Sequence, residues 1–66
     1  MNIRRTQSPK DIARRLNAEG YTEYPAKGDH RKFKKPGKDT VVLDMGVREI
    51  PIGTLRNIYR QAGWTW

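Results

Sequence analysis

The chain has 66 residues, which is enough for one small domain with a thin hydrophobic core. It contains no cysteine, which excludes disulfides, thiolate metal sites and thiol catalysis, and no apolar run approaches the roughly 18 residues of a membrane span. Fourteen Lys and Arg against seven Asp and Glu give a net charge of +7, which favours a polyanionic partner. We therefore expect a soluble cytoplasmic protein that binds no membrane, with one domain over residues 1–66 and a frayed extension at 1–7.

The first predicted element is a helix of about three turns that starts after Ser8. Ser8 suits the N-cap, Pro9 suits the first helical position, and Asp11 carries a carboxylate that can reach back to the cap. Gly20 ends the helix because glycine adopts the left-handed backbone conformation without steric cost. The apolar stripe of this helix consists of Ile12, Ala13 and Leu16.

Three short strands are predicted next, over 21–24, 30–35 and 40–45. A turn at 26–29 joins the first two, and a turn at 36–39 that contains Pro and Gly joins the last two. Because connections this short join antiparallel neighbours, we expect a three-stranded antiparallel meander.

A second helix is predicted from Pro51 to about Ala62, with Gly63 as its C-terminal signal. One indole of the short tail that follows is expected to fold back onto the core. The predicted order is therefore α-β-β-β-α, an α+β fold in which both helices cover one face of the sheet and leave the other open. The apolar face of the second helix consists of Ile52, Leu55, Ile58, Tyr59 and Ala62.

The segment 27–35 contains the only histidine of the chain, His30, among five Lys and Arg residues. Side chains alternate along a strand, so if Phe33 points to the helices, His30 and two lysines point to the open face. A phosphodiester can approach that face, and the cations would bind it through counterion release. The residues predicted to bind RNA are Lys27, Gly28, Arg31, Lys32, Lys34, Lys35 and Lys38.

Histidine suits RNA cleavage because imidazole changes its charge near neutral pH. A base must take the proton of the 2′-OH and an acid must protonate the leaving 5′-oxygen, and imidazole can fill either role without a metal ion. DNA lacks the 2′-OH, so this route applies to RNA alone. We therefore predict His30 as the general acid or base, with no metal and no cofactor. The sequence shows no obvious second acid or base, and Asp29 is the adjacent carboxylate.

The same residues also fit structural roles. A lone histidine in a basic loop is commonly only solvated, and a run of lysines commonly protects a strand edge from aggregation. Composition alone indicates a small basic α+β nucleic-acid binder. Two alternatives to a ribonuclease remain open: a non-catalytic RNA-binding module, and a protein-interaction module whose basic face binds an acidic partner. The residues expected to pack or to face water only are Tyr21 and Tyr24 (core or sheet), Arg56 and Arg60 (exposed face of the second helix), and Trp64 and Trp66 (structural).

Two motifs, one at the second strand and one at the second helix, carry a family resemblance. Residues 27–33 read KGDHRKF and are followed by Pro36, and residues 51–63 read PIGTLRNIYRQAG. Together with the opening helix and the pair Gly20-Tyr21, they extend over about residues 8–64. Over this span the sequence resembles the HicA family, the small toxins of HicA–HicB type II toxin–antitoxin systems.

The resemblance implies a fold like that of double-stranded-RNA-binding domains. It also implies a ribosome-independent endoribonuclease that acts on mRNA (an mRNA interferase), with His30 as the catalytic residue. The implied partner is a HicB-like antitoxin that covers His30, and we expect the free toxin to be a monomer. Two positions depart from the family pattern: Asp29 stands where serine is usual, and residues 43–46 read LDMG where the family continues into Pro-x-His. Both departures leave room for a weaker or altered nuclease activity.

Overall fold

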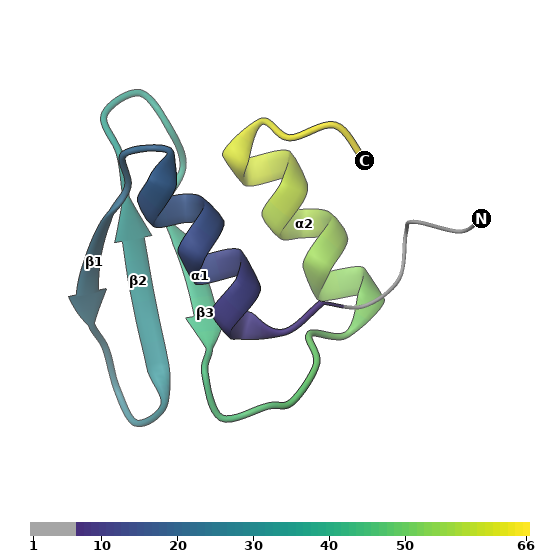
Figure 1. Cartoon of the computed structure of the whole chain (residues 1–66). Helices are drawn as coiled ribbons and strands as arrows, with labels where there is room; N and C mark the ends of the chain where they lie inside the picture. Colours follow the sequence, from purple (N-terminus) through teal and green to yellow (C-terminus); the bar gives the residue numbers. More distant parts are fainter. Residues whose placement is uncertain (1–6) are drawn as a thin grey trace.

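The computed structural model describes residues 7–66 as one three-stranded sheet and two helices (Figure 1). The order helix, strand, strand, strand, helix confirms the predicted α+β fold and is consistent with a fold like that of double-stranded-RNA-binding domains. The predicted boundaries differ from the observed ones by about one residue. The elements are α1 (Pro9–Ala18), β1 (Thr22–Pro25), β2 (His30–Lys34), β3 (Val41–Asp44) and α2 (Ile52–Ala62).

Both ends of α1 follow from its sequence. The Ser8 hydroxyl accepts a hydrogen bond from the Asp11 backbone N–H at 3.2 Å, which satisfies one of the free amides at the helix N-terminus. At the other end Gly20 has a φ of +95°, and the Tyr21 N–H donates to the Leu16 carbonyl at 3.0 Å. This left-handed cap turns the chain into β1.

α2 ends with the same kind of cap, which also places the C-terminal tail. Gly63 has a φ of +77°, and the Trp64 N–H donates to the Tyr59 carbonyl at 2.8 Å. The Trp64 side chain therefore returns to the core, where it is only 9% exposed. This confirms the prediction that one indole folds back.

The start of the described chain is held against α2. The Ile50 N–H donates to the Gln7 carbonyl at 2.8 Å, and the Tyr59 hydroxyl donates to the Gln7 side-chain carbonyl at 3.1 Å. The prediction of a frayed extension over 1–7 is therefore wrong for Gln7, because these two hydrogen bonds fix it. Residues 1–6 lie outside the described residues.

The sheet has the strand order β1-β2-β3, and each strand is antiparallel to the next. Figure 1 shows α1 crossing in front of the sheet and α2 beside α1, towards β3. Both helices therefore lie on one side of the sheet, as predicted, and no described element covers the other side.

The core lies between the helices and one face of β2 and β3. Phe33, in the middle strand, is completely buried, whereas β1 contributes no buried residue. Among residues 7–66, no helix is both long and apolar enough to cross a membrane. The core cluster consists of Ile12, Ala13, Leu16, Tyr21, Phe33, Val41, Leu43, Ile50, Leu55, Ile58, Ala62 and Trp64.

Candidate nucleic-acid interface

β2 divides its side chains between the two faces of the sheet. His30, Lys32 and Lys34 are exposed, whereas Arg31 is half-buried and Phe33 is buried. Because side chains alternate along a strand, the three exposed residues share the face away from the helices, called the open face below. The predicted orientation of His30 and its two lysines is confirmed.

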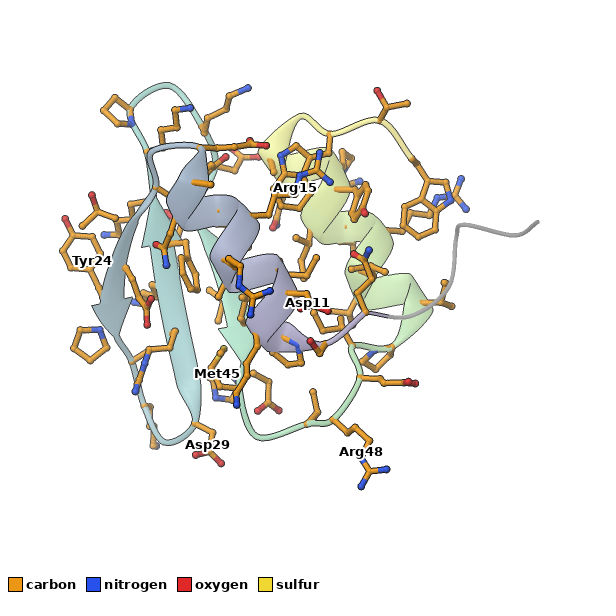
Figure 2. The ribbon with its side chains drawn as sticks, viewed as in Figure 1. Asp11, Arg15, Tyr24, Asp29, Met45 and Arg48 are labelled. Carbon is orange, nitrogen blue, oxygen red and sulfur yellow. The ribbon has the colours of Figure 1, made fainter. Side chains whose placement is uncertain are left out.

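The strand register places further residues on the open face. Tyr24 of β1 and Val42 of β3 both lie opposite Lys32. Tyr24 is 46% exposed, and Lys34 Nζ lies 5.6 Å from its ring centroid, within the range of a cation–π interaction. Figure 2 shows Tyr24 at the edge of the sheet formed by β1. Of the two expected places, core or sheet, Tyr24 therefore takes the sheet, where it packs on the exposed face, whereas Tyr21 is buried in the core.

Asp44 of β3 lies directly opposite His30. The His30 carbonyl accepts a hydrogen bond from the Ala26 N–H at 3.2 Å, so the backbone groups of His30 face β1. His30 and Asp44 therefore form a non-hydrogen-bonded pair, in which Cα atoms lie about 4.5 Å apart and side chains come closest. One oxygen of the Asp44 carboxylate accepts from the Gly46 N–H at 2.9 Å, which fixes the orientation of this carboxylate.

Asp29, the neighbour of His30 in sequence, lies at the tip of the β1–β2 hairpin (Figure 2). A Cβ atom on Gly46 would lie 2.6 Å from Asp29 Oδ2, so the Asp29 carboxylate packs against the connection between β3 and α2. Among residues 7–66, neither Asp29 nor Asp44 forms an ion pair with His30. The imidazole is thus exposed on the open face and accessible to a substrate.

Two of the cations predicted to bind RNA lie on the helix side of the sheet. Arg31 Nε lies 3.4 Å from Glu23 Oε2, and Lys35 Nζ donates to the Glu19 backbone carbonyl at 2.6 Å. Carbonyls at a helix C-terminus carry partial negative charge, so Lys35 caps α1. Both cations are therefore engaged within the fold.

The remaining three residues predicted to bind RNA, Lys27, Gly28 and Lys38, lie in the turns at the two ends of β2. Lys27 and Gly28 are exposed in the turn before His30, and Gly28 has a φ of +62° that favours glycine there. Lys38 lies in the loop after β2, with Nζ 2.9 Å from the position of a Cβ on Gly63. Lys27 and Gly28 therefore lie close to His30, whereas Lys38 lies at the C-terminal end of α2.

A protein-family model matches most of this chain. The family is described as the HicA toxin of bacterial toxin–antitoxin systems, and the match covers residues 9–64. The chain belongs to the HicA toxin family. No curated protein matches it. The resemblance read from the two motifs is therefore confirmed: this chain is the toxin of a toxin–antitoxin system, and its family implies a cognate antitoxin.

This HicA-family toxin has an apolar groove beside its open face, between β3 and the start of α2, with a volume of about 200 Å³. Val42 and Asp44 belong to both the groove and the open face. A partner segment in the groove would therefore contact the neighbours of His30. The groove is lined by Val42, Leu43, Asp44, Val47, Ile50, Pro51, Thr54 and Ile58.

Proposed function

We propose that this HicA-family toxin is an endoribonuclease that cleaves mRNA without a metal ion and without the ribosome. One observation chiefly supports the proposal: the only histidine is exposed on the uncovered face of the sheet, beside Lys32 and Lys34. Within the described chain neither lysine has an ion pair with a carboxylate, so both can bind phosphates. An mRNA substrate places this activity in the cytoplasm.

The proposed reaction is an internal transphosphorylation. The 2′-oxygen forms a bond to the adjacent phosphorus while the bond from phosphorus to the 5′-oxygen breaks, which leaves a 2′,3′-cyclic phosphate and a 5′-hydroxyl. His30 takes the 2′-proton as a base while water protonates the leaving 5′-oxygen or, when protonated, gives its proton to the 5′-oxygen while water takes the 2′-proton. Lys32 and Lys34 stabilise the charge that develops on the phosphorus oxygens. Asp44, opposite His30 in the strand register, orients the imidazole.

A HicB-like antitoxin, in this proposal, inhibits the monomeric toxin by covering His30. The net charge of +7 favours an acidic partner, which would bind the same cations as RNA. Val42 is 43% exposed and Val47 is 36% exposed, so the adjoining groove offers apolar surface to bury. Antitoxin and mRNA then compete for one face of the sheet.

The substitution His30→Ala tests the catalytic role. Purified parent and variant are incubated with an unstructured mRNA fragment in EDTA, and the rates of cleavage are compared. We expect the variant to cut about 10²–10⁴ times more slowly. Its melting temperature should change little, because the side chain is exposed and contributes nothing to the core. When each is expressed in a bacterial host, the parent should arrest growth with loss of mRNA and the variant should not. Equal cleavage by both proteins would exclude His30 as the catalytic group.

The substitution Asp44→Asn tests the orienting carboxylate. Asn keeps an oxygen that can accept from the Gly46 N–H, so the local turn is preserved. We expect kcat to fall by less than in His30→Ala, while affinity for RNA stays equal or rises because a negative charge is removed. Asp29→Asn removes the same charge from a carboxylate that packs against Gly46, and serves as the matched control. If the parent and every variant bound RNA tightly but left it uncut, the result would support the non-catalytic RNA-binding alternative.

A further inference from the structure

A second pocket lies on α2 and the C-terminal tail, away from the open face. Its volume is about 330 Å³. In Figure 1, α1 lies between β1 and the C-terminal part of the chain, which consists of α2 and the tail. His30 is the first residue of β2 and follows the turn that joins β1 to β2. The pocket is lined by Arg56, Asn57, Arg60, Trp64 and Trp66.

The aromatic wall of this pocket is built into the fold. The ring of Tyr59 makes edge-to-face contacts with both indoles, at centroid distances of 5.2 Å to Trp64 and 5.1 Å to Trp66. The Tyr59 hydroxyl is held by Gln7, and the Trp64 indole N–H donates to Glu19 Oε1 at 2.8 Å. The two indoles are therefore positioned before any ligand arrives, which lowers the entropic cost of binding.

The cationic wall has no acidic partner among residues 7–66. Arg56 and Arg60 are four residues apart on α2, so their side chains are neighbours. Arg56 Cζ lies 5.9 Å from the Trp66 ring centroid, and across residues 7–66 neither arginine forms an ion pair with a carboxylate. By contrast, Arg14, Arg15 and Arg31 each pair with one. In the described chain, two guanidinium groups without a carboxylate partner therefore lie beside two indoles, an arrangement that suits an anionic, aromatic ligand.

We propose that this pocket binds one unpaired nucleotide of single-stranded RNA, outside the bond that is cleaved. Guanidinium groups suit a phosphate because their planar N–H donors match its oxygens in pairs. Trp64 is buried, with Arg15 Cζ 3.8 Å from its ring centroid, so the half-buried Trp66 indole is the one that offers the base a surface for stacking. The Asn57 amide can both donate to and accept from a base edge. An acidic peptide would use the arginines but would have no planar group for the indoles. This inference rests on the proposed function, since it assigns the toxin a second contact with the same RNA.

The composition of the chain supplies a selective reporter. The chain has two tryptophans, and both line this pocket. Intrinsic fluorescence therefore reports the pocket, and the anisotropy of a labelled RNA reports binding anywhere on the protein. The full-length His30→Ala chain is the host for both measurements, so that the RNA remains uncut.

The experiment titrates this protein with an unstructured oligouridylate. We expect saturable quenching of tryptophan fluorescence with the same midpoint as the anisotropy change. Adding Arg56→Gln and Arg60→Gln should weaken binding about tenfold and reduce the slope of log K against log salt by about 0.7, since the two guanidinium groups share one phosphate and each phosphate contact of a single strand contributes about 0.7. Adding Arg14→Gln and Arg48→Gln removes the same charge outside the pocket, and should leave the quenching in place.

The outcomes separate this inference from the proposed function. Anisotropy without quenching would overturn the nucleotide pocket and leave RNA binding at the open face intact. Equal quenching by polyglutamate would also overturn it, because the pocket would then accept any polyanion. Absence of binding in both measurements at low salt would overturn the pocket and the ribonuclease proposal together.

Discussion

The two sides of β2 use similar residues for different purposes. On the helix side, Phe33 is completely buried and Arg31 lies 3.4 Å from a carboxylate of Glu23. On the open face, His30, Lys32 and Lys34 are exposed, and no carboxylate of the described chain forms an ion pair with them. The helix side therefore satisfies its charges within the fold, and the open face keeps its charges for a partner.

This difference teaches that stability and proposed function are separable along one strand. Burial of apolar surface, which dominates stability, is confined to one side of the sheet. The cations of the other side repel one another, and within the described chain no carboxylate pairs with them, although Lys34 lies over the Tyr24 ring. Substitutions on the two sides should therefore affect different measurements.

The largest expected effect is that of Phe33→Ala. Removing a fully buried aromatic side chain costs about 3–5 kcal/mol. Whole domains have only about 5–15 kcal/mol of stability, and a small one has less to lose, so the variant should be largely unfolded. Urea denaturation followed by circular dichroism measures this cost.

Lys32→Ala, one position before Phe33 and on the open face, is the matched control. It should change the free energy of unfolding by no more than about 0.5 kcal/mol. A comparable loss of stability in both variants would mean that the open face is not free of structural roles.

Strand alternation explains why the sequence predicted so much of the open face. A single assumption, that Phe33 points to the core, determined the orientation of His30 and of two lysines. The helix ends were equally predictable, because Ser8 and Gly63 act through local backbone geometry.

Features that depend on contacts between distant segments were missed. Asp44 lies opposite His30 only because of the strand register, which neither strand reveals alone. Lys35 was assigned to RNA, but the end of α1 presents a carbonyl to its ammonium group. Arg56 is exposed as predicted, but its proximity to Trp66 was not predicted, because no local pattern encodes the path of the tail.

The second prediction concerns matched pairs of cations on the two sides. Lys32→Gln with Lys34→Gln removes two charges from the open face, and should reduce the slope of log K against log salt for single-stranded RNA by about 1.4. Arg31→Gln with Lys35→Gln removes the same charge from the helix side. Because those two cations are engaged by Glu23 and Glu19, the slope should change far less.

Fluorescence anisotropy at several salt concentrations measures both slopes. The helix-side pair should instead lower the melting temperature slightly, since an exposed ion pair contributes about 0–1 kcal/mol. If the two double variants lost equal slope, RNA binding would follow total charge and the division between the faces would not matter for it.

The smallest expected effect is the acid sensitivity of the helix side, which centres on Glu19. Its carboxylate accepts hydrogen bonds from the Trp64 indole at 2.8 Å and from Arg15 at 3.3 Å. The hydrogen bond from Trp64 holds the pKa of Glu19 below its ordinary value of 4.5, with help from the charges of Arg15 and Lys35 and against a smaller opposing effect of burial. Because the pKa is lowered in the folded state, ionised Glu19 stabilises the fold above pH 4.5, and this contribution disappears as the pH falls through the lowered value.

Glu19→Gln separates the charge of this group from its hydrogen bond. Glutamine can still accept from the Trp64 indole but carries no charge. We expect the parent to be more stable than the variant by less than about 1 kcal/mol near neutral pH, because the group is exposed, and the two stabilities to converge in acid. Melting temperatures from about pH 7 to about pH 3 measure this convergence, with Asp39→Asn as the background for losing one carboxylate. A difference that stayed constant with pH would show that Glu19 acts through packing and not through its charge. Convergence would show that the helix side depends on its internal ion pairs, as the open face does not.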